Sequence, residues 1–243
     1  MTLFRRREVW LPTLWGTLLL LGLAGLVGLL LARMANGFLA PNDPARGAGG
    51  GGARTLVVEG WLDEPDLVQA AQAFRRGHYE RVLTTGGPIT AGSEFSGHMN
   101  YAARAASRLQ ALGVVSVPVI AVPAPASKQD RTYLSAVMVR DWAQQSGVAL
   151  EAIDLFTAGV HARRSRMLYR MALGPAVEVG VLAAVPDGFD AERWWTSSVG
   201  TKLVMGEAVS LAWTSCCFWP PAPGSHEERW AVPATLGASS APK

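Results

Sequence analysis

The middle of the chain alternates short apolar runs with longer stretches in which apolar positions recur at a helical period. Each apolar run has the length of a β-strand and each amphipathic stretch has the length of an α-helix. The expected strands cover residues 55–60, 81–87, 117–125, 152–159 and 177–186. The expected helices cover residues 63–77, 98–113, 130–147 and 160–174, and a long segment from Ala191 to Trp219 follows the last strand.

Strands and helices that alternate in this order indicate right-handed crossovers and a parallel sheet covered on both faces. The apolar runs are continuous, as expected for strands that water does not reach from either side. In the first helix Asp63 is suited to the N-cap, Pro65 to the first turn and Gly77 to the end. The sequence therefore predicts an α/β, Rossmann-like, doubly wound parallel sheet of about five strands within residues 55–219.

The N-terminal end has a different pattern, because residues 14–32 carry no charge at all. At about 1.5 Å per residue, a helix of this length spans a hydrocarbon core of about 30 Å. Arginines at residues 5–7 precede it, and Trp10 and Trp15 lie where an interfacial belt is expected. We expect a single-pass anchor in the lipid bilayer, with a cytoplasmic N-terminus. A cleaved signal peptide is the alternative, but the small residues of a cleavage site are missing.

The remaining segments are expected to have little structure. Residues 1–35 would form a cytoplasmic stub and the anchor, and residues 36–54, rich in Gly and Pro, a flexible linker. Residues 220–243 are rich in Pro, Ala and Ser without periodicity, so we expect a disordered tail.

Composition narrows the possible functions. Of 243 residues, 17% are charged, below the roughly 25% usual for soluble domains, and the apolar anchor explains the deficit. The net charge of +3 and the lack of a basic stripe with interleaved aromatics argue against nucleic acid as a partner. Cys216 and Cys217 are adjacent, so we expect neither a disulfide nor a metal finger, and the pair should pack as small apolar residues in a helix.

Candidate site residues follow the strands, because ligands of such sheets bind beyond the carboxyl ends of the strands. Glu59 and Gly60 end the first strand, where the carboxylate could transfer protons or pair with an arginine. A solvated glutamate in a helix-entry turn is the alternative. Thr85, Gly86 and Gly87 end the second strand, where paired glycines allow a ligand to approach backbone N–H groups, although Gly-Gly-Pro is equally a simple loop.

The third and fourth strands contribute polar residues at the starts of helices. Asp130, Arg131 and Thr132 lie around a helix N-terminus, where free N–H groups and the dipole favour an anion. An aspartate cap beside a surface arginine is the alternative reading. Thr157 ends the fourth strand and His161 begins the helix after it, facing the same crevice.

Arg164 is the most informative of these residues. At about 100° per residue it falls in the middle of an apolar helix face, whereas Ser165 points outward. That face consists of Val160, Met167, Leu168 and Met171. A buried, unpaired guanidinium costs several kcal/mol, so Arg164 needs a bound anion or a carboxylate partner. We expect an anion, and an internal salt bridge to Glu59 or Asp130 is the alternative.

The motifs "TTGGP", "LQALGV", "DRTYLSA" and "TAGVHARRSRMLYR", in this order, resemble the ElyC/SanA/YdcF-like family of bacterial envelope proteins. The resemblance covers roughly residues 55–219 and includes the single anchor that SanA-like members carry. It implies a Rossmann-like domain, and several members are linked to cell-envelope and peptidoglycan biogenesis or to the envelope barrier. With the cytoplasmic N-terminus expected from the arginines at residues 5–7, we expect the domain to lie outside the cytoplasm on the bacterial inner (plasma) membrane. One YdcF-like member is associated with S-adenosylmethionine, and no reaction is established for the family.

We therefore expect a membrane-anchored envelope protein that binds an anionic ligand, such as the phosphate of a lipid-linked glycan precursor. If the protein is an enzyme, Glu59, Asp130 and His161 are the candidates for proton transfer. No metal motif, P-loop or nucleophile elbow identifies a cofactor or a reaction. The alternatives are a non-catalytic sensing or scaffolding module, and a nucleotide- or S-adenosylmethionine-binding enzyme whose domain faces the cytoplasm.

Overall fold

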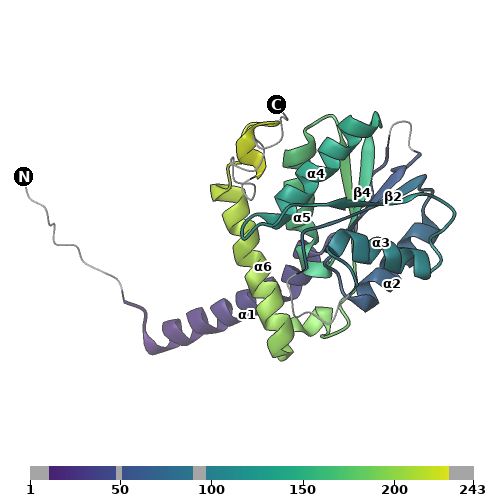
Figure 1. The fold of residues 1–243 in the computed structure, drawn as a ribbon. Coiled ribbons are helices and arrows are strands. Elements are labelled where there is room, and N and C mark those ends of the chain that lie inside the picture. Colours follow the sequence, from purple (N-terminus) through teal and green to yellow (C-terminus); the bar gives the residue numbers. More distant parts are fainter. Residues whose placement is uncertain (1–10, 48–50, 90–96, 230–243) are drawn as a thin grey trace, which may run out of the picture.

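Five parallel strands form one sheet in the order β3-β2-β1-β4-β5 (Figure 1). The computed structural model describes residues 11–47, 51–89 and 97–229. The strands are β1 (Thr55–Glu59), β2 (Arg81–Gly86), β3 (Val119–Pro123), β4 (Ala152–Thr157) and β5 (Glu178–Ala183). Each lies within one of the predicted apolar runs, so the predicted α/β fold with a five-stranded parallel sheet is confirmed.

Two pairs of helices cover the faces of the sheet. The pair on one face is α2 (Glu64–Arg76) and α3 (Tyr101–Ala111), and the pair on the other is α4 (Arg131–Ser146) and α5 (Ala162–Leu173). Asp63 caps α2 by accepting a hydrogen bond from the Asp66 N–H at 3.3 Å, and Gly77 ends the helix, as predicted. From β1 the chain first adds β2 and β3 on one side of the sheet and then β4 and β5 on the other, so β1 lies between β2 and β4.

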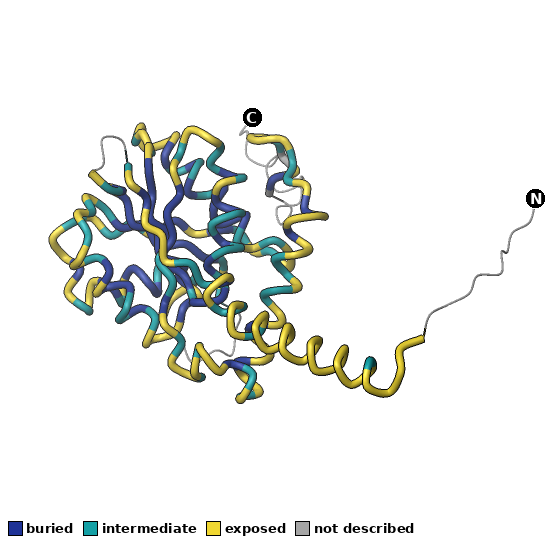
Figure 2. The backbone as a smooth tube through the Cα atoms, turned by 180° about the vertical axis from the view of Figure 1, so that it is seen from behind, coloured by how far each residue is buried: buried dark blue, intermediate teal, exposed yellow. Residues whose placement is uncertain are grey.

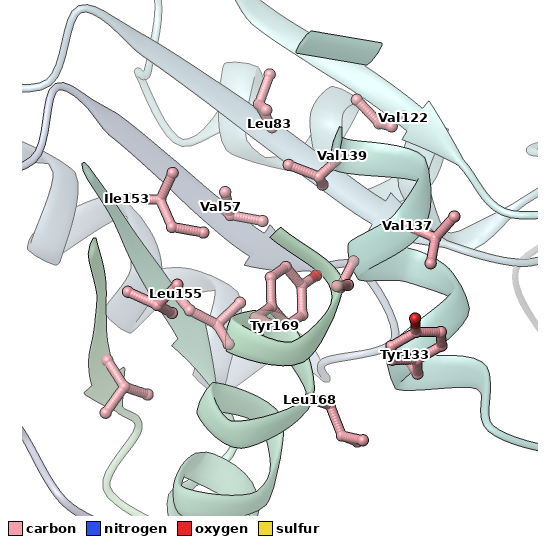
Figure 3. Packing of buried hydrophobic residues seen from close by; sticks show 14 of the residues in the cluster. Val57, Leu83, Val122, Tyr133, Val137, Val139, Ile153, Leu155, Leu168 and Tyr169 are labelled. Carbon is pink, nitrogen blue, oxygen red and sulfur yellow. The ribbon is translucent and has the colours of Figure 1, made fainter. Parts of the chain in front are cut away.

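Alternate residues of the strands pack into two separate cores. Val57, Leu83 and Leu155 lie under α4 and α5, together with the fully buried Tyr133 and Tyr169 (Figure 3). The neighbouring strand residues on the opposite face contact α2 and α3: Leu56, Val58, Val82 and Phe156. The apolar runs are continuous because both sets of residues are buried.

Two further helices lie at the edge of this unit. The N-terminal helix α1 (Leu14–Leu39) has a mean hydropathy of 2.3 in its most apolar window and could cross a membrane. Its first half projects from the domain and is exposed except at Gly16 (Figure 2). Its last two turns pack against η3 (Ala191–Thr196) and α6 (Ser198–Cys217). The arginines at 5–7 and Trp10, on which the expected orientation depends, lie outside the described residues.

The expected flexible linker is wrong for residues 43–47, which cross the edge of the sheet. Asp43 and Val181 exchange two backbone hydrogen bonds of 2.9 Å in an antiparallel bridge. The Ala45 N–H donates to the buried carboxylate of Asp154 at 2.7 Å, and Gly180 leaves room for this close approach. The linker thereby covers the exposed edge of β5.

The expected disordered tail is also wrong for its described part, residues 220–229. Glu228, in the short helix η4 (His226–Arg229), is 1% exposed and forms an ion pair of 2.7 Å with Arg140 of α4. The same carboxylate accepts hydrogen bonds from the hydroxyl of Tyr133 and the backbone N–H of Gly224. Residues 230–243 lie outside the described part of the chain.

The expectation for the two cysteines is half correct. Cys216 and Cys217 end α6, as predicted for residues in a helix, but the structure joins them in a disulfide that we did not expect. Cys216 and Cys217 are also exposed, so they are not part of the core.

Candidate functional site

The candidate residues gather at the carboxyl edge of the sheet, where β1 and β4 lie side by side. This is the switch point at which helices leave to opposite faces, and it is the usual place of ligands in doubly wound sheets. Glu59 ends β1 and Thr157 ends β4. Gly60 follows Glu59 and donates its N–H to the Thr85 carbonyl at 2.7 Å. A side chain at Gly60 would overlap the backbone of β2 and α3, so this turn requires glycine.

Glu59 lies beneath this edge rather than on its surface. Its side chain is 1% exposed, and its two carboxylate oxygens accept hydrogen bonds from the hydroxyls of Thr157 at 2.5 Å and Ser165 at 3.1 Å. Beside it, the hydroxyls of Thr85 and Tyr169 lie 3.3 Å apart. Burial, together with the Glu59 charge, raises the pKa of Tyr169 far above its ordinary value. These groups form a buried polar layer beneath the carboxyl edge of the sheet, which a ligand does not reach directly.

The orientation of α5 differs from the expected one. Its buried residues are Ala162, Ser165, Leu168, Tyr169 and Ala172, so the side of the helix that carries Ser165 faces the core. Ser165 is 0% exposed although we expected it to point outward, whereas Arg164 lies at the side of the helix and is partly exposed. The serine was misplaced because helical spacing was centred on the apolar face around Arg164, which made Ser165 point outward. Its partner is a buried carboxylate that comes from β1, distant in the sequence.

The counter-ion of Arg164 is Glu207 of α6, and not a residue that we had considered. The guanidinium Nε and Nη2 donate to the two Glu207 oxygens at 2.9 Å and 3.1 Å. The expectation that Arg164 needs a negative partner is therefore met inside the chain, and a bound anion is not required. Glu207 could have been found from the sequence, because it is the one acid in the apolar stretch of residues 203–219.

His161 belongs to the same cluster. Its Nδ1 lies 2.8 Å from Glu207 Oε1, and because a carboxylate can only accept, Nδ1 carries the proton. Its Nε2 is then the basic nitrogen, 3.5 Å from the Thr132 hydroxyl, and Arg164 Nη2 lies beside the ring, 2.9 Å from Nδ1 and 3.2 Å from Nε2. The half-exposed ring of Trp61 stands edge-on to the imidazole at 5.2 Å between centroids.

Electrostatics keep Glu207 ionised. Burial is the largest influence and would raise its pKa, but the hydrogen bonds from His161 and Arg164, with the charges of Arg164 and of His161 in its protonated form, outweigh burial and lower the pKa to about 2. Asp130 behaves differently, because burial raises the pKa of its carboxyl and Arg164 only partly opposes this. Its backbone has a φ of 48°, and its side chain does not cap α4. A non-glycine residue in this left-handed region is uncommon and is strained.

A separate cavity of about 300 Å³ lies at the carboxyl ends of β2 and β3. Gly87 and Arg131 line it, with Tyr101 and Ser127 among their neighbours. Arg131 begins α4, so the free N–H groups of that helix start beside the cavity. Gly86 has a φ of 140°, a backbone conformation that would be strained for a residue with a side chain.

The predicted residues thus fall into three adjacent groups rather than one pocket. Glu59, Thr85 and Thr157 are buried, and Gly87 and Arg131 line the cavity. In the third group, His161 and Arg164 bind Glu207, and Thr132 lies beside His161. Within residues 11–47, 51–89 and 97–229, no group of three His, Cys, Asp or Glu side chains is arranged to hold a metal ion.

The geometry permits two kinds of chemistry. The cavity offers a cation and backbone N–H groups to an anion, and His161 offers a base whose ring is held by a carboxylate.

Comparisons with known protein families and with curated proteins found no match to this chain.

Proposed function

We propose that this chain is a membrane-anchored protein of the bacterial cell envelope, related to the ElyC/SanA/YdcF-like family. Its α/β domain would lie outside the cytoplasm and bind an anionic, phosphate-bearing ligand, such as a lipid-linked precursor of peptidoglycan or another glycan. The apolar helix α1 and the order of motifs in residues 55–219 support this proposal. The arginines at residues 5–7 favour a cytoplasmic N-terminus in the inner (plasma) membrane.

The observation that carries the ligand proposal is the cavity beside Arg131. Arg131 is exposed, and no acid lies within salt-bridge distance of it among the described residues. Arg164 cannot serve the same purpose without competition, because Glu207 already neutralises its charge. We therefore assign the contact with the ligand to Arg131 and the amides around Gly87, and a supporting role to Arg164.

Binding of phosphate tests this assignment. Purified full-length protein in detergent is titrated with inorganic phosphate and with an isoprenyl phosphate, and the affinity is measured by calorimetry. Loss of a charge-assisted contact in Arg131→Met should weaken binding roughly tenfold, whereas Arg131→Lys should weaken it less. Arg76→Met, at the exposed end of α2, is the matched control. Equal affinities of all four proteins would refute the assignment.

Orientation separates this proposal from a nucleotide- or S-adenosylmethionine-dependent enzyme, since those cofactors are scarce outside the cytoplasm. A phosphatase reporter that is active only outside the cytoplasm, fused after Lys243, should be active. An inactive phosphatase and an active cytoplasmic reporter at the same position would instead favour the cofactor-dependent enzyme.

A second candidate function, acid–base catalysis at the same edge, is favoured by the alignment of Glu207, His161 and Thr132. The carboxylate orients the imidazole, and Nε2, 3.5 Å from the Thr132 hydroxyl, would be the base. His161→Asn should abolish turnover of a lipid phosphate or diphosphate while ligand binding persists. Full envelope function in cells that carry His161→Asn would favour a non-catalytic sensing or scaffolding module.

A further inference from the structure

The helix α6 has the reverse of the polarity expected for a surface helix. Of its two charged residues, Glu207 faces the domain and binds Arg164, and Val204 of the same helix is fully buried. Its outward stripe is apolar: Met205, Val209 and Trp213 are exposed by 53%, 67% and 50%. A helix that faced only water would place its charges outward and its apolar side chains inward.

The apolar outer surface is continuous along most of α6. We define the outer face of α6 as the exposed residues on the side away from Val204: Lys202, Met205, Gly206, Val209, Ala212, Trp213 and Cys216. Lys202 is the one charged member of this face, and it stands near the N-terminal end of the helix. Trp219, 83% exposed, continues the surface beyond the helix. Lysine and tryptophan at the ends of an apolar surface are typical of the membrane interface.

The outer face of α6 lies next to the point where the apolar span leaves the domain. Ala32, Ala35 and Leu39 of α1 pack in one cluster with Val204 of α6, and the indole N–H of Trp194 donates to the Ala32 carbonyl at 2.8 Å. Before Ala32 the helix runs away from the domain on the side that α6 covers (Figure 1). A bilayer crossed by α1 therefore begins beside α6.

The surface next to this face is positively charged. A groove of about 830 Å³ between α5 and α6 is lined by Arg163, Arg166 and Arg170, with Leu211 and Met167 contributing apolar walls. Arg166 pairs with Asp43 at 2.8 Å. Arg163 and Arg170 each donate to a backbone carbonyl, and the Arg163 guanidinium also lies over the ring of Phe38 at 4.0 Å from its centroid. No acid lies within salt-bridge distance of Arg163 or Arg170 among the described residues. Glu178 also lines the groove, but its carboxylate accepts hydrogen bonds from the backbone of Arg46 and Gly47.

We propose that the outer face of α6 lies on the surface of the bilayer that α1 crosses, and that Arg163 and Arg170 contact the phosphates of anionic lipids there. Apolar side chains enter the acyl boundary, and the arginines meet the headgroups, as in an interfacial helix. The domain is then held against the membrane at two places, by α1 and by α6. This inference rests on the membrane anchor of the proposed function and not on the ligand at the sheet edge.

The test measures the environment of α6 in the full-length protein. A single cysteine replaces Val209 or, as the matched control, the exposed Gln72 of α2, in a background with Cys216→Ser and Cys217→Ser. Each variant carries an environment-sensitive fluorophore and is reconstituted into phosphatidylcholine vesicles with and without phosphatidylglycerol. Lipids with a nitroxide on the acyl chain then quench any fluorophore that enters the bilayer.

The expected result is a blue-shifted emission and strong quenching at position 209, with neither change at position 72. Phosphatidylglycerol should increase the quenching at 209, and Arg163→Gln with Arg170→Gln should remove that increase, whereas Arg76→Gln should not. A label at 209 that stays as water-exposed as the control overturns the proposal. Protection that lipid quenchers do not reach, and that disappears on dilution of the protein in the vesicles, also overturns it and identifies a second copy as the partner.

Discussion

The guanidinium of Arg164 and the carboxylate of Glu207 bind each other through two parallel hydrogen bonds, Nε–Oε2 at 2.9 Å and Nη2–Oε1 at 3.1 Å. The pair joins α5 to α6, and both side chains are less than one fifth exposed. It therefore fixes the last long helix to the sheet domain and, through the same carboxylate, orients His161. One contact therefore links the packing of α6 to the position of the His161 ring.

Loss of either partner should destabilise the domain. Arg164→Met or Glu207→Leu leaves one partly buried charge without a counter-ion, and we expect each to lower the free energy of unfolding by about 2 kcal/mol. The double variant should lose less free energy of unfolding than the two single variants lose together, by about 1 kcal/mol or more, because neither charge remains. Denaturant unfolding followed by circular dichroism measures this coupling. Additive losses would indicate that the two side chains act independently.

The contribution of Glu207 should depend on pH. Because the folded protein lowers the pKa of Glu207 from 4.5 to about 2, its stabilising effect is complete above pH 4.5 and is lost as the pH falls toward 2. The difference corresponds to about 3 kcal/mol at most. In unfolding measurements across this range, the wild type should lose stability more steeply than Glu207→Gln. Parallel pH profiles of the two proteins would contradict the lowered pKa.

Ser165 should matter for stability although it resembles a surface residue in the sequence. Its hydroxyl is one of two that satisfy the buried Glu59 carboxylate, so Ser165→Ala should cost about 1–3 kcal/mol. Ser107→Ala, an exposed serine of α3, provides the same chemical change without a buried partner and should have little effect. Thermal unfolding of both variants compares them. Equal melting temperatures would show that Glu59 does not need the serine.

The described part of the C-terminal tail should also stabilise the domain. Arg140 binds Glu228 at 2.7 Å and 2.9 Å, and this pairing raises the pKa of Arg140 above its ordinary value. Glu228→Gln should therefore lower the free energy of unfolding by about 2 kcal/mol. The neighbouring Glu227→Gln removes the same charge from an exposed position and serves as the control. If the two variants unfold alike, the tail does not hold α4 in solution.

The segments that could be predicted are those whose structure is determined by residues close to them in the sequence. The strand runs, the capping of α2 by Asp63 and the apolar α1 follow from local periodicity, from turn residues and from uniform hydropathy. The placement of Thr157 and Glu59 at one edge followed from the topology that this alternation implies. These features needed no knowledge of long-range contacts.

The partners of polar residues were decided by tertiary structure alone. Helical spacing placed Arg164 on an apolar face and Ser165 outward, but the actual rotation of α5 depends on a carboxylate from β1 and another from α6. In the same way, the linker at Ala45 and the tail at Glu228 become ordered because Asp154 and Arg140, distant in the sequence, offer them hydrogen bonds. Local composition determines whether a segment can form a helix or a strand. The pairing of buried charges depends on which elements the completed sheet brings together, and hydropathy along the chain does not contain that information.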